Sequence, residues 1–327
     1  MMKEWVSYKT LLLAVLIVVL TLLPRWITST FYIHTLIMVF YFSYLGVCWN
    51  LLAGYVGLAS LGHAMFVGTG AYTSSLLMMN FGVSPWVGMW AGAFLSLILG
   101  LFLGFLAFRY GLKGHYFLLV TIAFCEILKI LVLNIRSFGG GSGIAIVLKG
   151  SGSPFWQFVF TQKITYYYVI LVMLIGILLL LHLLLQTRTG HYFVAVRENE
   201  ELAQASGIHV MKTKLIAMSL SAVLTSIAGT FYAQYICFID PPSVFGLGVS
   251  VDLLIPAIVG GLGTVLGPVL GAFIVIPLGE AVRAHLGGGT GGVHLIIYGS
   301  FLVFVILFMR KGLLGLFSRL SFLRRRG

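Results

Sequence analysis

Long apolar runs separated by short polar breaks make up most of this chain. A helix needs about 20 apolar residues to cross the ~30 Å hydrocarbon core of a bilayer, and most of the runs have that length. The candidate spans are residues 10–29, 31–53, 56–79, 86–108, 115–134, 166–186, 215–237, 249–263, 264–284 and 293–309. The pattern predicts an all-α polytopic membrane protein with about ten transmembrane or partly re-entrant helices. The short run at 249–263 ends in Gly260-Gly261-Leu262-Gly263, which is typical of a half-helix or re-entrant segment.

A polar interval at residues 187–214 interrupts the apolar runs in the middle of the chain. Its charges have no place in hydrocarbon, so it is expected in water. We predict a short helix here, with Glu198, Glu200 and Glu201 in the first turn, where the positive helix end favours acids. Gly207 is the candidate residue that ends this helix. A helix this short needs a surface to lie against, and both a groove in a partner protein and lipid headgroups fit the pattern.

Two glycine-rich stretches, 57–72 and 260–272, fall in the third and eighth spans. Small residues let helix backbones approach closely, which is the ordinary interpretation of such stretches. Glycine within a span is also where transporters break helices and expose backbone groups to substrate. The two stretches occupy equivalent positions in a five-plus-five arrangement, which would be inverted because five is odd. A 5+5 inverted repeat is therefore a hypothesis of the sequence.

Polar side chains inside the apolar runs are costly and therefore informative. Asn50 and His63 flank the first glycine-rich stretch, and Asp252 lies near the start of the eighth span. Lining a polar pathway and hydrogen bonding between helices are both open interpretations for these three residues.

Two pairs of opposite charges lie within the spans, Glu126 with Lys129 and Glu280 with Arg283. Each pair is spaced three residues apart, so both partners lie on one helix face and can neutralise each other. We expect both pairs to have a structural role.

The composition fits a membrane protein. Of the 327 residues, 60% are hydrophobic and 9% are charged, whereas soluble proteins carry about 25% charged residues. No polar stretch is long enough to fold separately, so residues 1–327 are expected to form a single transmembrane domain. The formal net charge of +12 comes from basic residues that flank the apolar runs. That placement favours contact with anionic membrane lipid and a positive-inside orientation, and no nucleic acid partner is expected.

Sequence signatures of catalysis are missing. The chain contains no Gly-x-x-x-x-Gly-Lys-Ser/Thr phosphate loop, no His-Glu-x-x-His and no Gly-x-Ser-x-Gly elbow. Its acids and histidines are too scattered to predict a metal site. Cys48, Cys125 and Cys237 lie far apart within apolar runs and are expected to be small packing residues. We therefore expect a non-catalytic protein with no catalytic residues, no metal and no cofactor of its own.

The basic residues also predict an orientation. Arg109 and Lys113 mark a short loop that the positive-inside rule places in the cytoplasm, together with the 187–214 interval and both termini. The longest extracytoplasmic loop is then about 135–165, rich in glycine and serine, and a second turn at Asp240-Pro241-Pro242-Ser243 lies on the same side. The start of the chain looks like a signal peptide, but no small-x-small cleavage site follows, so it is expected to remain as the first helix.

Four stretches form a combined pattern that is more specific than any one of them. They are Val196-Arg197-Glu198-Asn199-Glu200 with Ala203 and Gly207-Ile208; Ser60-Leu61-Gly62-His63-Ala64 with Phe66, Gly68, Gly70, Ala71 and Tyr72; Thr121-Ile122-Ala123-Phe124 with Glu126; and Gly260-Gly261-Leu262-Gly263-Thr264 with Gly267-Pro268 and Gly271-Ala272. The combination resembles the branched-chain amino-acid ABC transporter permeases of the LivH/LivM type, from about residue 40 to 315. Length and span distribution look more like the LivM half.

The resemblance implies partners and a location. It implies a second, LivH-like permease subunit, two cytoplasmic ATPase subunits that bind the ATP, and a periplasmic or extracellular substrate-binding protein. The location it implies is the bacterial cytoplasmic (inner) membrane. Leucine, isoleucine or valine is the implied substrate, while related importers for urea, short amides or aromatic acids stay open. A different class, an ion-coupled secondary transporter with Glu126 or Asp252 as proton carrier, and a membrane scaffold without transport activity are the alternatives.

Two sets of site residues follow from the resemblance and the polar positions. The residues predicted to couple to an ATPase are Arg197, Glu198, Asn199, Glu200, Ala203 and Gly207. The residues predicted to lie along the translocation pathway are Asn50, Gly62, His63, Tyr72 and Asp252. Asp252 departs from the family pattern, which leads us to expect a longer acid or a neutral residue there.

Overall fold

The computed structural model describes residues 19–26, 29–146, 155–286 and 299–300. Its long helices are α2 (Thr30–Ala53), α3 (Ala64–Phe81), α4 (Pro85–Arg109), α5 (Gly114–Asn134), α6 (Lys163–Gln186), α9 (Val210–Ile236), α11 (Leu247–Gly260) and α12 (Gly267–Leu286). The shorter helices are α7 (Arg188–Glu198), α8 (Glu200–Ala205) and α10 (Pro241–Phe245), with 3-10 turns at Leu23–Arg25, Arg136–Phe138 and Gly140–Ser142. The all-α prediction is confirmed for the described residues, apart from two two-residue strands.

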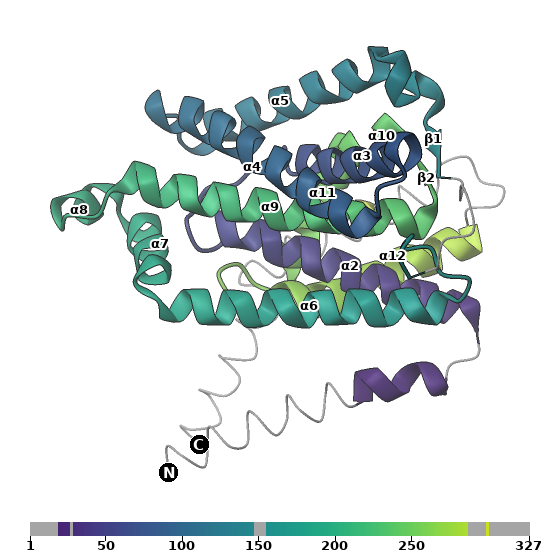
Figure 1. Ribbon diagram of the computed structural model, residues 1–327. Coiled ribbons are helices and arrows are strands. Elements are labelled where there is room, and N and C mark those ends of the chain that lie inside the picture. Colours follow the sequence, from purple (N-terminus) through teal and green to yellow (C-terminus); the bar gives the residue numbers. More distant parts are fainter. Residues whose placement is uncertain (1–18, 27–28, 147–154, 287–298, 301–327) are drawn as a thin grey trace, which may run out of the picture.

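The long helices lie side by side in one bundle (Figure 1). Helix α9 packs against α3 and α4, while α2 packs against α6, α11 and α12, and α2 and α9 also touch each other. Helix α5 lies along the outside of the bundle, and α7 and α8 project from one end, at the left of Figure 1. We call this end the α7–α8 end. The arrangement buries α2 on nearly all sides and leaves α5 and α6 largely exposed.

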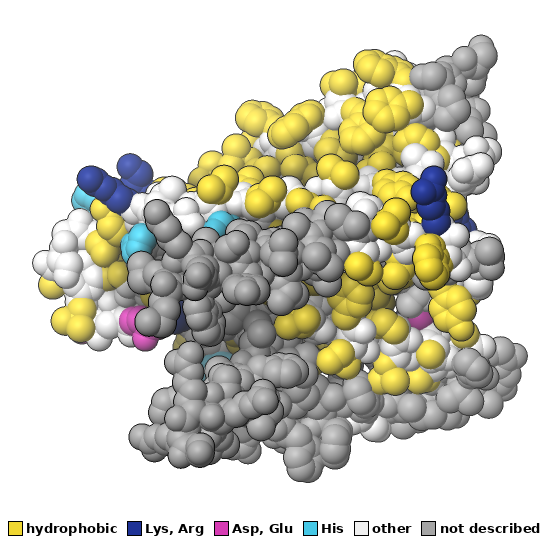
Figure 2. All heavy atoms as spheres, turned by 90° about the horizontal axis from the view of Figure 1, so that it is seen from below, with side chains coloured by type: hydrophobic (Ala, Val, Ile, Leu, Met, Phe, Trp, Pro, Cys, Tyr) yellow, Lys and Arg dark blue, Asp and Glu magenta, His cyan; other side chains and the backbone are white. Residues whose placement is uncertain are grey.

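Seven described helical segments are long and apolar enough to cross a membrane. They are Thr30–Ala53, Pro85–Arg109, Gly114–Asn134, Lys163–Gln186, Val210–Ile236, Pro241–Gly260 and Gly267–Ala284. Their outward surfaces are apolar, as expected for contact with lipid tails, and in Figure 2 yellow apolar side chains cover much of the described surface. These features fit a multi-pass membrane protein. The predicted count of ten stays a prediction, because the runs 10–29 and 293–309 lie mostly outside the described residues.

The third predicted span begins later than the sequence indicated. Residues 56–79 were expected to be helical, but residues 54–63 are not in a helix and α3 starts at Ala64. The chain turns at Gly57, whose φ of 81° favours glycine. Helix α3 is less apolar than the seven spanning segments, and its neighbours α4, α9 and α10 explain this, because its polar and small side chains face protein.

The eighth span differs in a similar way. The predicted run 249–263 corresponds to α11, which ends at Gly260, and a short helix, α10, precedes it. Together they form the 20-residue segment Pro241–Gly260, long enough to cross a bilayer. The predicted turn at Asp240 is the N-terminal cap of α10, where the Asp240 and Ser243 side chains form a capping box. Residues 261–266 then form a non-helical break before α12.

Glycines allow a close helix approach between α3 and α9. A Cβ added at Gly70 would collide with the backbone carbonyl of Ser226, and one at Gly229 would collide with the carbonyl of Val67. The small residues of the first glycine-rich stretch therefore serve close packing, as the ordinary interpretation predicted.

A two-stranded antiparallel pair lies at the end of the bundle opposite α7 and α8. Strand β1 (Ile144–Ala145) pairs with β2 (Phe238–Ile239), with Ile144 opposite Ile239. The pair attaches the segment after α5 to the segment after α9. Strand β1 lies in the predicted 135–165 loop, of which residues 147–154 fall outside the described part.

Candidate functional site

The polar interval folds as two helices rather than one. Helix α7 covers Arg188–Glu198 and the six-residue α8 covers Glu200–Ala205, so Glu198 ends the first helix and is not in the first turn of the second. Asn199 caps α8, because its Oδ1 accepts hydrogen bonds from the backbone N–H groups of Glu201 and Leu202 at 2.9 and 3.0 Å. Glu200 and Glu201 do lie in the first turn of α8, as predicted.

A glycine ends α8 as the sequence predicted. Gly207 has a φ of 83° and donates its N–H to the carbonyl of Gln204, while Ile208 donates to the carbonyl of Ala203. These two bonds form a Schellman motif, which satisfies the last carbonyls of the helix. Caps at both ends therefore fix a helix that is too short to be stable alone.

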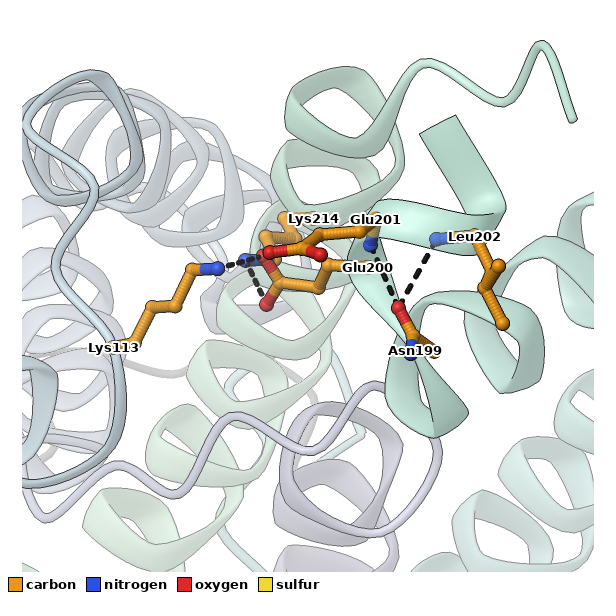
Figure 3. A network of polar contacts seen from close by, with 6 residues as sticks. All are labelled: Lys113, Asn199, Glu200, Glu201, Leu202 and Lys214. Atoms are coloured by element: carbon orange, nitrogen blue, oxygen red, sulfur yellow. Dashed lines mark hydrogen bonds and ion pairs between the residues drawn. The ribbon is translucent and has the colours of Figure 1, made fainter. Parts of the chain in front are cut away.

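Glu200 attaches α8 to two other segments (Figure 3). One carboxylate oxygen accepts from Lys214 of α9 at 2.5 Å and the other pairs with Lys113, before α5, at 2.9 Å. Partial burial of Glu200 favours the neutral acid, but the hydrogen bonds and charges of the two lysines outweigh it and hold the pKa of Glu200 below its usual value. The same contact raises the pKa of Lys113. The Lys214 side chain is only 5% exposed, so Glu200 is the partner that keeps its charge tolerable.

Arg197 attaches the end of α7 to the two non-helical, glycine-rich breaks of the chain, residues 54–63 and 261–266. Its Nη1 donates to the backbone carbonyl of Gly54 at 2.7 Å, and its Nε and Nη2 bond to the carboxylate of Glu198. The Arg197 side chain lies against Gly57, and its guanidinium lies close to Gly263. The first break, residues 54–63, and the second, residues 261–266, therefore meet at this side chain.

Asn50 ties α2 to the second break. Its Nδ2 donates to the carbonyl of Thr264 at 2.8 Å, and its Oδ1 accepts from the N–H of Gly263 at 2.9 Å. The residue is fully buried. Of the two sequence interpretations, hydrogen bonding between segments describes Asn50 in this conformation, since both ends of its amide are used by the second break.

His63, Gly62 and Tyr72 are also buried in this conformation. His63 Nε2 lies 2.8 Å from Ser221 Oγ, and that hydroxyl donates to the carbonyl of Cys48, so the imidazole donates from Nε2. Its Nδ1 has no hydrogen-bond partner among the residues that the structure describes. A Cβ at Gly62 would collide with the carbonyl of Thr121, and the ring of Tyr72 packs against Phe245.

Asp252 is separated from these residues. It lies on α11, where it lines a cavity together with side chains of α2, α9 and α12 at the end opposite α7 and α8. The structure thus brings Arg197 and Asn50 together at one set of backbone breaks and places Asp252 elsewhere. The predicted pairs are confirmed, with Glu126 to Lys129 at 2.5 Å and Glu280 to Arg283 at 3.0 Å.

The residues predicted to couple to an ATPase differ in their exposure. Glu198 is exposed, as is Leu202, whose side chain is 66% exposed, whereas Ala203 is buried against the bundle. Lys113, Lys214 and Gly54 were not among the predicted site residues. The basic residue at 214 in a polar interval was a signal, but its pairing with Glu200 depends on the fold. Among the described residues no group of three His, Cys, Asp or Glu side chains is placed to hold a metal.

Comparison with known proteins identifies the family. Residues 29–309 match the profile of the family described as "Branched-chain amino acid transport system / permease component". The chain belongs to this family. It is 28% identical over 303 residues to the high-affinity branched-chain amino acid transport system permease protein LivM of Escherichia coli (strain K12), covering 86% of this chain and 69% of that protein. LivM of Salmonella typhimurium is 27% identical with the same coverage.

A more distant relative within the family is a probable branched-chain amino acid transport permease protein LivH. The protein of Methanocaldococcus jannaschii is 31% identical over 140 residues, 43% of this chain and 42% of its own length. No solved structure matches the chain significantly. The matched family region contains α7, α8 and both glycine-rich breaks, so the contacts of Arg197 and Asn50 lie within the permease region itself.

Proposed function

We propose that this chain is the LivM-like permease subunit of an ATP-driven ABC importer for branched-chain amino acids. The match to LivM over most of the chain supports this substrate class. Its partners are a LivH-like permease subunit, two cytoplasmic ATPase subunits and an external substrate-binding protein. The chain provides the path and the partner ATPases provide the hydrolysis of ATP.

The α7–α8 segment is the element that transmits the ATPase movement in this proposal. The observation that carries the proposal is the attachment of the α7–α8 segment to the bundle. Glu200 ties α8 to α9 and the α4–α5 loop, and Arg197 ties α7 to the first glycine-rich break. A projecting segment held by such contacts moves together with the helices behind it. The exposed Glu198 and Leu202 are the side chains that meet the ATPase.

The distribution of basic residues supports a cytoplasmic location for the α7–α8 end. Near this end lie Arg109, Lys113, Arg188, Arg197, Lys212 and Lys214. Near the other end lie Arg25, Arg136, Lys163 and Arg283. The positive-inside rule then places α7 and α8 in the cytoplasm and the β1–β2 pair outside. Counting α3 as a crossing beside the seven segments, and adding the predicted first and tenth spans, gives ten crossings, which put both termini in the cytoplasm of a bacterial inner membrane.

Transport follows as a shift between two packings. When the ATPase subunits close, they draw the coupling segments of the two permease subunits together and favour an outward-open pathway. In this chain the movement reaches the two glycine-rich breaks through Arg197, and Asn50 ties the second break to α2. These breaks are the hinge positions in the proposal, and an inverted 5+5 relation between the halves would explain why each half has one.

Reconstitution of the full importer in liposomes tests this proposal. We expect leucine uptake that requires ATP, the ATPase subunits and the binding protein. Leu202→Cys should form a crosslink to an ATPase subunit, whereas Leu179→Cys, an exposed position on the apolar surface of α6, should not. Uptake that continues without any ATPase would refute the proposal in favour of an ion-coupled transporter. Uptake of urea, amides or aromatic acids with no uptake of leucine would retain the importer and correct its substrate.

A further inference from the structure

A cavity of about 370 Å³ lies between α2, α9, α11 and α12 at the end opposite α7 and α8. Its volume falls within the range of about 300–1,000 Å³ that is usual for small-molecule sites. Its lining includes both charged or polar side chains and apolar or aromatic ones. The charged side chains are those of Asp252, Glu280 and Arg283, and the apolar ones include those of Met38, Val249 and Ile276.

Asp252 is the free acid of this cavity. Among the described residues it has no hydrogen-bond or ion-pair partner, although Arg283 acts on it electrostatically. Glu280 differs, because it is paired with Arg283 one turn along α12. An unpaired carboxylate within a span is costly, and a ligand that brings a cationic donor removes much of that cost.

Arg283 retains donors for an anion. Its Nη1 bonds to Glu280 at 3.0 Å, and a guanidinium carries five N–H donors in a planar fork. Among the described residues the N–H groups of Nε and Nη2 have no hydrogen-bond partner, so they are available for a carboxylate, which an arginine fork binds in a bidentate manner. The cavity thus offers an acceptor for an ammonium group and donors for a carboxylate.

We propose that this cavity binds an aliphatic α-amino acid in transit, with its ammonium group at Asp252 and its carboxylate at Arg283. The hydrocarbon side chain of the ligand lies against Met38, Val249 and Ile276. The inference rests on the proposed import of branched-chain amino acids and adds a binding site within this subunit. A zwitterion adds no net charge to the membrane interior, which suits a site that must also release its ligand.

Protection of an introduced cysteine tests the site directly. The experiment uses the assembled permease and ATPase complex in nanodiscs, without the binding protein. The background variant is Cys237→Ser, because Cys237 is partly exposed, whereas Cys48 and Cys125 are buried and can stay in place. Val249→Cys is labelled with a maleimide. At a leucine concentration of about twice its dissociation constant, labelling should slow about threefold, because two-thirds of the sites are occupied. The single-headed analogues 4-methylpentanoate and 3-methylbutylamine should protect much less.

Variants separate the two charged contacts. Asp252→Asn should remove the preference for leucine over 4-methylpentanoate, and Arg283→Gln should remove the preference for leucine over leucinamide. Leu179→Met, a conservative change on the outer surface of α6 and away from the cavity, should retain both preferences. Equal labelling with and without leucine, in a complex that performs ATP-driven leucine uptake once the binding protein is added, would overturn the site while leaving the proposed function intact. A complex in which leucine slows the labelling, but which performs no ATP-driven leucine uptake, would retain the site and overturn the proposed function.

Discussion

The carboxylate of Glu200 joins three segments of the chain, and the buried Lys214 depends on it as an ion-pair partner. We predict that Glu200→Gln destabilises the protein by about 1–3 kcal/mol, because the Lys214 charge is left without its partner in a buried place while Glu200 itself is only about a quarter exposed. Unfolding of the solubilised protein in denaturant measures this loss. The double variant Glu200→Gln, Lys214→Met should recover most of it, and a double variant as unstable as the single one would contradict the assignment.

The same contact gives a pH dependence with a definite sign. The folded pKa of Glu200 is lowered from 4.5, so its contribution to stability is complete above that value and is lost as the pH falls through the lowered pKa. The difference in Tm between wild type and Glu200→Gln should therefore be constant near neutral pH and shrink as the solution is acidified below about pH 4.5. A difference that grows on acidification would show that another group controls this end of the bundle.

Single-residue reasoning from the sequence was accurate where both partners lie on one helix. The Glu126–Lys129 and Glu280–Arg283 pairs follow from a spacing of three residues, and both are present. The pairing of Glu200 with Lys214 crosses from α8 to α9, so no local spacing could predict it. The cavity around Asp252 could not be predicted either, because its walls come from five helices whose packing does not follow from local spacing.

At the scale of helices, hydrophobic length predicted most elements within a few residues. The runs 31–53, 86–108 and 115–134 correspond to α2, α4 and α5. Helix α7 was missed because its sequence mixes polar and apolar residues, and its burial of Phe193 and Val196 is a tertiary effect. The late start of α3 was missed because the 56–63 segment is as apolar as a span, and only the packing at Gly57 and Gly62 shows why it is not helical.

The crossing of α3 and α9 offers a prediction about packing. Gly229→Ala should destabilise the bundle by about 1–3 kcal/mol, because the added methyl group meets the backbone of Val67 and a backbone cannot move aside as a side chain can. Gly176→Ala is the matched control, since no neighbouring atom lies within 4 Å of its added Cβ in the middle of α6. There the change should be neutral or stabilising by up to about 1 kcal/mol. Thermal unfolding of the two variants measures the contrast, and equal Tm values would refute the close approach.

For the whole molecule, the proposed function requires that a movement at α7 reach the helices behind it. Arg197 touches both breaks, through its bond to the Gly54 carbonyl and its contact with Gly263. The neighbouring side chains of Glu198 and Leu202 are exposed and would meet the ATPase in the proposed importer. Binding of the ATPase and transmission of its movement would therefore depend on different side chains.

This separation predicts an uncoupled importer. Arg197→Ala should retain the ATPase subunits and their hydrolysis of ATP, yet lower the leucine transported per ATP by about fivefold or more, the range of a coupling energy of about 1–3 kcal/mol. Arg188→Ala at the exposed start of α7 is the control and should leave the ratio unchanged, since the described residues give Arg188 no hydrogen-bond or ion-pair partner. Parallel measurement of uptake and phosphate release in one liposome preparation gives the ratio. Loss of the ATPase subunits from the Arg197→Ala complex would show that the side chain holds the motor in place, and transmission would then have to be assigned to Glu200 and its two lysines.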